Sequence, residues 1–163
     1  MGMKYLLTIL VMLGISNSPA DHQLSDEEIK AVVDTHNVWR DQVGVPPLTW
    51  SDELAEVAAG WAKVLKKKGC RLQHSKLSYG ENLFSGTSGY FDATYVVNEW
   101  GGEKKFYNYR QNKCKSGEMC GHYTQMVWRS TTKVGCAKIQ CRDMDIWVCE
   151  YDPPGNWVGE KPY

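Results

Sequence analysis

The six cysteines of this chain constrain its fold more than any other feature of the sequence. The chain has 163 residues, which is enough for one domain and leaves little room for a second. An even set of cysteines in an exported chain predicts three disulfides, but six cysteines allow fifteen pairings. The pairing therefore needs a further argument for Cys70, Cys114, Cys120, Cys136, Cys141 and Cys149.

The first twenty residues have the pattern of a secretory signal peptide. Lys4 is their only charge, Tyr5–Ile15 is an apolar run, and Ser18-Pro19-Ala20 supplies small residues before a cleavage point. The apolar run is shorter than the roughly 20 residues that cross a bilayer. We therefore expect a leader over 1–20, a mature domain over 21–163, secretion from the cell, and no transmembrane segment.

The charge balance excludes partners that are recognised by charge alone. The chain has 19 Lys and Arg residues against 19 Asp and Glu residues. A net charge near zero gives no electrostatic reason to expect nucleic acid or an anionic membrane as a partner. The basic run Lys66–Lys68 is typical of a solvated helix end. The overall composition, with 42% apolar residues, is that of an ordinary globular protein.

The end of the chain has the pattern of a β-hairpin. Val134–Cys141 and Asp145–Tyr151 read as two strands joined by a turn at Arg142-Asp143. A hairpin centred on this turn places Cys136 directly opposite Cys149. Directly opposed residues have Cβ atoms about 4.5–5.5 Å apart, which is near the separation that a disulfide needs.

The hairpin pairing leaves two further disulfides to assign. Cys114 and Cys120 are close enough in sequence to close a small loop, and Cys70 then remains for Cys141. With all six cysteines paired, no thiol is left to act as a nucleophile.

The first half of the mature chain has helical spacing. Ser25 and Glu28 form a capping box at the start of one helix. Ser51 begins a second helix, which Gly69 closes. A third helix is expected over Phe91–Trp100.

The remaining segments are less regular. Gly101-Gly102 is expected to interrupt the third helix, and residues 104–118 are expected to form a polar loop. Since helices come first and strands later, with no alternation, the order predicts an α+β fold with an antiparallel sheet.

Two histidines and two glutamates are the residues most suited to chemistry. Neutral imidazole and carboxylate groups bind zinc-like ions, and they also serve in acid–base catalysis. Spacing alone does not bring together His74, Glu81, Glu103 and His122, which we call the tetrad. His36 lies on the apolar face of the first helix and is expected to be a buried structural group.

Five motifs in this chain resemble those of the CAP superfamily, which includes the cysteine-rich secretory proteins, antigen 5 and pathogenesis-related 1 proteins. The resemblance runs from about residue 28 to residue 163, and the six-cysteine layout is most similar to the pathogenesis-related 1 branch. The motifs are His36-Asn37-x-x-Arg40, Cys70-Arg71-Leu72-Gln73-His74-Ser75, Tyr79-Gly80-Glu81-Asn82-Leu83, Gly121–Thr131 and Val148–Trp157.

The resemblance implies an α-β-α sandwich with a central antiparallel sheet and the disulfides proposed above. It also implies that the tetrad lies in one cleft. His74, Glu81 and His122 match family motifs directly, and Glu103 matches a Trp-x-x-Glu pattern at Trp100. In some members the two histidines bind zinc or another divalent ion, which makes His74 and His122 the expected metal ligands.

The family further implies a monomeric, secreted and mostly non-enzymatic protein that binds a sterol or other lipid in defence or host interaction. The expected lipid loop contains Phe106, Tyr107 and Tyr109, whose rings either offer an apolar face or tuck inward. No catalytic residue is expected. A metal-dependent hydrolase that uses the tetrad is the alternative.

The end of the chain gives a further alternative. Pro153–Tyr163 resembles a signalling peptide that is released from plant members, although Glu150 stands where the plant pattern has Asn. The chain would then be a peptide precursor.

Overall fold

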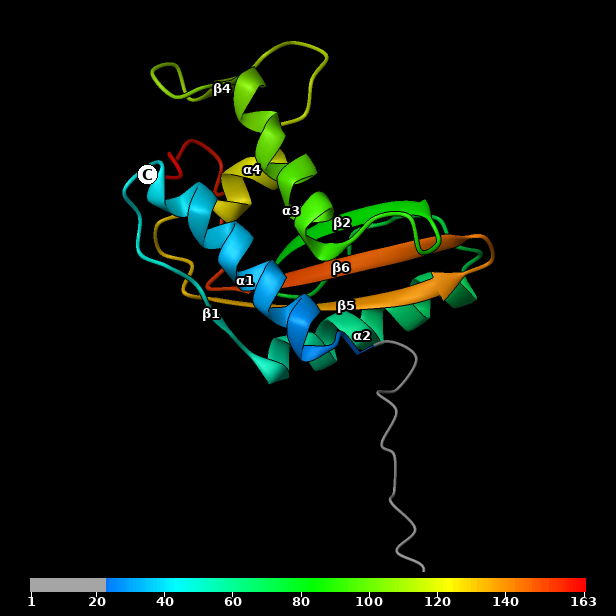
Figure 1. Ribbon diagram of the computed structural model, residues 1–163. Helices are drawn as coiled ribbons and strands as arrows, with labels where there is room; N and C mark the ends of the chain where they lie inside the picture. Colours follow the sequence, from blue (N-terminus) through cyan, green and yellow to red (C-terminus); the bar gives the residue numbers. More distant parts are fainter. Residues whose placement is uncertain (1–22) are drawn as a thin grey trace, which may run out of the picture.

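The computed structural model describes residues 23–163, so the predicted leader over 1–20 lies outside the described residues. Helices and strands alternate over residues 26–102, so the predicted order of helices first and strands later is wrong for this part of the chain (Figure 1). In order they are α1 (Asp26–Asp41), β1 (Thr49–Trp50), α2 (Asp52–Lys67), β2 (Gly80–Thr87), α3 (Ala93–Gly102), the 3-10 helix η1 (Glu103–Phe106), β3 (Tyr107–Asn108), β4 (Lys113–Cys114), α4 (Gly121–Met126), β5 (Lys133–Cys141) and β6 (Met144–Asp152).

The main sheet lies between two helical layers, as the family resemblance implies. Its strand order is β1-β5-β6-β2. The three long strands pair antiparallel, whereas the two-residue β1 pairs parallel with β5, so the sheet is not antiparallel throughout. Helix α2 lies under one face, and α1 and α3 lie over the other (Figure 1).

Each face of the sheet has its own core, because neighbouring strand residues point to opposite sides. The core towards α1, α3 and α4 contains buried Val32, Val97, Trp100, Trp147 and Tyr151. The core towards α2 contains buried Ala58, Ala62, Leu65, Ile146 and Val148.

Close packing of α2 on β5 requires a small residue in the strand. A Cβ atom at Gly135 would lie 2.3 Å from the backbone nitrogen of Ala55 and 2.4 Å from the carbonyl oxygen of Ser51. Since real Cβ atoms do not approach backbone this closely, glycine is needed here.

The predicted helix starts are confirmed. The Ser25 side chain accepts from the Glu28 backbone N–H, and the Glu28 side chain accepts from the Ser25 N–H, which completes the capping box of α1. At α2 the cap is a single bond, in which the Ser51 side chain accepts from the Leu54 backbone N–H. Gly69 follows α2 with φ +85°, a left-handed conformation that favours glycine.

The predictions for the third helix and the following loop were partly wrong. Helix α3 begins at Ala93 and runs through both glycines to Gly102. Gly101 is tolerated because the helix packs against Trp39, whose ring would lie 2.2 Å from an added Cβ atom. The segment 104–118 is not a simple loop, since η1 and the β3–β4 hairpin lie in it.

The three predicted disulfides are all present. Cys136 and Cys149 are partners in the β5–β6 register, as the hairpin argument requires. Cys70 bonds to Cys141, and Cys114 bonds to Cys120. Among residues 23–163, no helix combines the length and apolar character needed to cross a membrane.

A buried polar cluster, which we call the Arg40 junction, ties α1 to α4 and to the segment after it. Within the junction, the Arg40 guanidinium donates to four carbonyl oxygens, those of Pro46 (2.6 Å), Met126 (2.8 Å), Trp128 (3.0 Å) and Thr131 (2.9 Å). These bonds fix α1 to the last residue of α4 and to the segment that follows α4.

His36 is buried next to this junction, as predicted. Its Nδ1 lies 2.7 Å from the Val32 carbonyl oxygen, so Nδ1 carries the proton, and its Nε2 accepts from the Tyr151 hydroxyl at 2.8 Å. Burial lowers the pKa of His36 to about 4. The neutral ring is therefore a structural link between α1 and β6.

Candidate functional site

The first pair of tetrad residues joins the segment after α2 to the start of strand β2. His74 Nδ1 lies 2.6 Å from Glu81 Oε1. The Glu81 carboxylate also accepts from the Ser75 backbone N–H at 3.0 and 3.2 Å. The Glu81 side chain is 5% exposed and that of His74 is 64% exposed, so a buried carboxylate holds an accessible imidazole. The hydrogen bond to Glu81 raises the pKa of His74.

The second pair joins η1 to α4. His122 Nδ1 lies 2.6 Å from Glu103 Oε1, and Glu103 Oε2 accepts from the backbone N–H groups of His122 and Tyr123. Glu103 thus satisfies the first donors of α4, which Cys120 does not cap. The His122 ring stacks on Trp100 with centroids 6.1 Å apart. Both members of this pair are mostly buried.

Strand β2 connects the two pairs. Glu81 and Asn82 are consecutive in β2. The Asn82 side chain donates to the His122 carbonyl oxygen at 3.1 Å and to the Tyr151 hydroxyl at 3.1 Å. The strand that carries the first histidine–carboxylate pair therefore also holds the backbone of the second.

The hydrogen bonds fix which ring nitrogen of each tetrad histidine is available. An ionised carboxylate only accepts, so both Nδ1 atoms carry a proton. The Nε2 atoms of His74 and His122 are then the free lone pairs of the neutral rings. A carboxylate behind a histidine in this way is the usual support of a metal-binding imidazole.

The donor set is nevertheless small. Within residues 23–163, no three His, Cys, Asp or Glu side chains are grouped so that they could hold a metal ion. The tetrad residues thus supply two oriented imidazoles rather than a complete ligand cage.

Glu150 is a buried carboxyl group that the sequence analysis noted only as a departure from the plant pattern. It lies opposite Glu81 in the β2–β6 register and is fully buried. Within the described part of the chain, no donor group reaches either of its oxygens. Burial, together with the neighbouring Glu81 carboxylate, raises the pKa of Glu150 well above the ordinary value. The sequence analysis did not predict strand β2. The alternation of inward and outward side chains along this strand would have indicated that Glu81 faces the same side as Glu150.

The rings of the expected lipid loop are mostly engaged by the protein itself. The Tyr107 hydroxyl donates to Asn112 at 2.6 Å. Tyr109 stacks on Tyr163 with centroids 4.5 Å apart. Phe106 is half-buried, with the ammonium groups of Lys105 and Lys115 over its ring.

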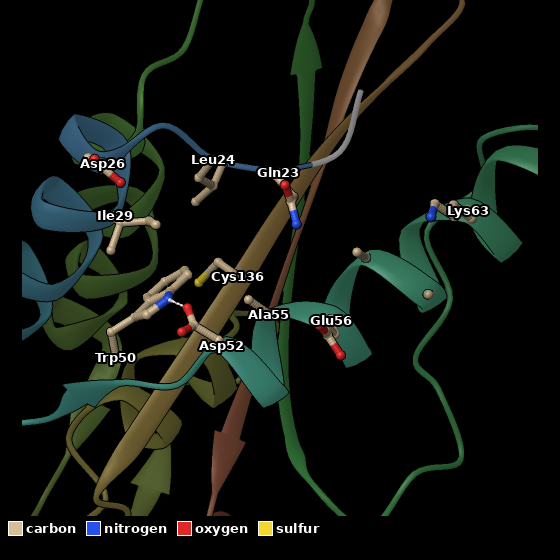
Figure 2. A pocket seen from close by; sticks show the side chains of 12 residues that line it. Gln23, Leu24, Asp26, Ile29, Trp50, Asp52, Ala55, Glu56, Lys63 and Cys136 are labelled. Carbon is tan, nitrogen blue, oxygen red and sulfur yellow. Dashed lines mark hydrogen bonds between the residues drawn. The ribbon is translucent and has the colours of Figure 1, made fainter. Parts of the chain in front are cut away.

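A cavity of ≈ 710 Å³ lies between the beginnings of α1 and α2 and includes none of the tetrad. Figure 2 shows Trp50 at one side, where its ring nitrogen donates to Asp52 at 2.9 Å. The apolar lining includes Leu24, Ile29, Ala55 and Cys136, and the polar lining includes Gln23, Asp26, Glu56 and Lys63. Its volume is within the range of small-molecule sites.

The final segment, Pro153–Tyr163, is bound to the domain along its length. The Gly155 N–H donates to Gln125 at 2.9 Å, and the Asn112 side chain donates to the Glu160 carbonyl oxygen at 2.8 Å. The Arg129 N–H donates to the Pro162 carbonyl oxygen at 2.7 Å. Release of this segment as a peptide would break all of these bonds.

Comparison with known proteins agrees with this architecture. A model described as the cysteine-rich secretory protein family, CAP, matches residues 33–151. Pathogenesis-related protein 1A of Nicotiana tabacum is 45% identical over 157 residues, covering 96% of this chain and 90% of the relative. Pathogenesis-related protein PR-1 of Medicago truncatula is 49% identical over 129 residues, covering 78% of this chain and 74% of the relative.

A solved structure of similar fold gives the same result. The crystal structure of NaASP2 with Zn²⁺ matches with a TM-score of 0.69 and 26% identity, covering 85% of this chain and 86% of that one. The sandwich, the three disulfides and the matched relatives together place the chain in a family. This protein belongs to the cysteine-rich secretory protein (CAP) family and is of the pathogenesis-related 1 type.

Proposed function

We propose that this protein is a secreted, non-enzymatic member of the CAP family that binds a sterol or other lipid in defence or host interaction. The observation that carries the proposal is the similarity to pathogenesis-related protein 1A, which spans 96% of this chain. The pattern of residues 1–20 supports secretion through a cleaved leader.

The cavity between α1 and α2 supports a ligand with a large apolar body. Its apolar lining includes buried Leu24 and Cys136 together with Ile29 and Trp50. Polar side chains line the same cavity and can orient the polar end of a bound molecule. A sterol combines these two properties, since its ring system is apolar and its hydroxyl group is polar.

The tetrad supports a role in holding a divalent ion such as zinc. The Nε2 atoms of His74 and His122 would be the ligands, with Glu81 and Glu103 fixing the rings through Nδ1. The remaining ligand positions would be taken by water or by a polar group of a bound molecule. A bound ion would supply positive charge at the surface beside β2. The structural relative NaASP2 was solved with Zn²⁺.

The chemistry of the described residues supports a binding role over catalysis. All six cysteines form disulfides, so none is a free nucleophile. An acyl-transfer enzyme also needs donors that stabilise a developing negative charge. Around the tetrad, Glu103 already accepts from the first N–H groups of α4, which makes them unavailable for this purpose.

Titration of the purified mature chain with a fluorescent sterol tests the proposal. We expect saturable binding to the wild type. Phe106→Ser/Tyr109→Ser removes two rings of the expected lipid loop, and Ile29→Asp places a charge in the cavity between α1 and α2. Loss of binding in one of these variants assigns the ligand to that place. Tyr90→Ser is the matched control, because this ring is 76% exposed and belongs to neither place.

Absence of saturable binding to sterols and to phospholipids would overturn the lipid proposal. The hydrolase alternative makes a different prediction. It requires ester or peptide hydrolysis that a chelator abolishes and that is lost in both His74→Ala and His122→Ala. Hydrolysis with this pattern would replace the binding role by a catalytic one.

A further inference from the structure

The middle of the chain contains a long segment with cations and no acids. Between Glu56 and Glu81 there are six Lys or Arg residues and no Asp or Glu, although the whole chain is balanced at 19 and 19. All six cationic side chains are exposed. The charge balance of the whole chain therefore conceals a strong local excess of positive charge.

Five of these cations lie in the last turn of α2 and in the segment that directly follows it. The Trp61 ring nitrogen donates to the Gln73 carbonyl oxygen at 2.9 Å, which holds the following segment against the helix. The Cys70–Cys141 disulfide fixes the same segment to the tip of the β5–β6 hairpin. We call this surface the basic face, and its cations are Lys66, Lys67, Lys68, Arg71 and Lys76.

The acids near the basic face do not neutralise it. Glu81 is buried and bonded to His74. Asp145 is buried and accepts from Ser88 and Gly89. On the adjoining hairpin tip, the exposed Asp143 is matched by the exposed Arg142.

The basic face also exposes apolar side chains. Leu72 is 41% exposed and Leu77 is 49% exposed. Next to Leu77 lies a groove of ≈ 360 Å³, whose lining includes Trp61, Lys68 and His74. The Lys68 ammonium lies 5.4 Å from the centre of the Trp61 ring. Two of the cations thus line one groove together with Leu77 and an aromatic ring, and Leu72 is exposed in the same segment of the chain.

We propose that the basic face docks on the surface of an anionic lipid bilayer. Clustered Lys and Arg residues are attracted to anionic headgroups, each changing partitioning by about fivefold. Charge alone gives weak and salt-sensitive attachment, and stable attachment needs a second, apolar signal. Leu72 and Leu77 supply that signal, because leucine side chains favour the acyl boundary over water.

The leucines favour a bilayer over a soluble polyanion as the partner. A nucleic acid or an acidic polysaccharide would neutralise the lysines but would offer little apolar surface to Leu72 and Leu77. An anionic bilayer offers both negative charge to the lysines and apolar surface to the leucines. The exposed His74 imidazole would then lie at the membrane side of the protein. The proposal goes beyond lipid binding, since docking on a bilayer requires no lipid in a cavity.

Co-sedimentation of the mature chain with vesicles tests the docking proposal. We expect binding to phosphatidylcholine vesicles that contain about one third phosphatidylglycerol, and little binding to phosphatidylcholine alone. The variant Lys67→Gln/Lys68→Gln/Arg71→Gln should lower the partition coefficient on the order of 100-fold. Leu72→Ser/Leu77→Ser should keep binding at low salt and lose it at about 0.5 M salt, where charge attraction is screened.

A second basic segment gives a matched control. Residues 104–115 contain five cations and no acid, and Lys105, Arg110 and Lys113 are exposed. Lys105→Gln/Arg110→Gln/Lys113→Gln changes the net charge equally and should leave vesicle binding within about threefold of wild type. Thermal unfolding confirms that each variant is folded.

Three results would overturn the proposal. They are absence of binding to the anionic vesicles, equal loss in the two triple variants, and binding to inorganic polyphosphate without binding to vesicles. None of them affects the sterol titration, so failure of docking and failure of the proposed function are distinguishable.

Discussion

Arg40 and Glu150 are two buried ionisable side chains that differ in their hydrogen-bond partners. Arg40 is surrounded by four carbonyl oxygens that accept hydrogen bonds from its guanidinium group. Glu150 lies beside another carboxyl group, and among residues 23–163 no donor reaches its oxygens. Both side chains are fully buried. The difference between them is therefore one of partners rather than of exposure.

The partners decide whether the buried group keeps its charge. Burial lowers the pKa of Arg40 only to about 10, so Arg40 stays charged at neutral pH. Burial raises the pKa of Glu150, and the nearby Glu81 carboxylate raises it further. Glu150 therefore keeps its proton in the folded state, because a second buried negative charge is unfavourable there. Arg40 contributes to stability. Glu150 opposes folding at a pH where it is ionised in the unfolded chain, because the carboxylate must then take up a proton to be buried.

Arg40→Met should have the largest effect of the substitutions in this comparison. The side chain keeps a similar length, but four carbonyl oxygens lose their donors. We expect a loss of about 3–5 kcal/mol in the free energy of unfolding, measured by urea denaturation. Arg129→Met is the control, because Arg129 is exposed and its side chain makes one long hydrogen bond, 3.4 Å to Gly44. An equal loss in both variants would refute the role of the Arg40 junction.

Glu150→Gln should have a smaller effect that depends on pH. The pKa of Glu150 is raised above its ordinary value of 4.5, so this residue's contribution to stability is complete below pH 4.5 and falls as the pH rises. We expect the wild type to lose about 2 kcal/mol between pH 5 and pH 7, relative to a variant that cannot ionise at this position. Glu150→Gln should therefore be the more stable protein at neutral pH.

Urea denaturation at the two pH values measures this difference, with the exposed Glu118→Gln as the control. If Glu150 were ionised in the folded protein, the variant and the wild type would show the same slope of stability against pH. That outcome would mean that Glu150 has a partner like those of Arg40, and the comparison would fail.

Local sequence signals predicted local structure well. The capping box at Ser25 and the cap at Ser51 are each set by a few neighbouring residues, and both helix starts are confirmed. The Cys136–Cys149 bond followed from the register of one hairpin, which its own turn determines. These features need no information from distant parts of the chain.

Features that depend on distant partners were not predicted from patterns in the residues. Strand β2 was missed because its apolar run is short and its pairing with β6 joins segments about sixty positions apart. Helix α3 runs through Gly101 because Trp39 of another helix packs there. The expectation that the tetrad residues lie in one cleft came from the family resemblance, since spacing alone does not bring them together, and their arrangement as two histidine–carboxylate pairs was seen only in the structure.

The central functional claim is that the two histidine–carboxylate pairs, joined through β2, form one site. Calorimetric titration of the mature chain with Zn²⁺ tests it most directly. The account predicts one ion per chain, with binding lost in both His74→Ala and His122→Ala. His36 adds no second ion to this count, because its ring is buried. Binding that survives either single substitution, or two independent ions per chain, would contradict it.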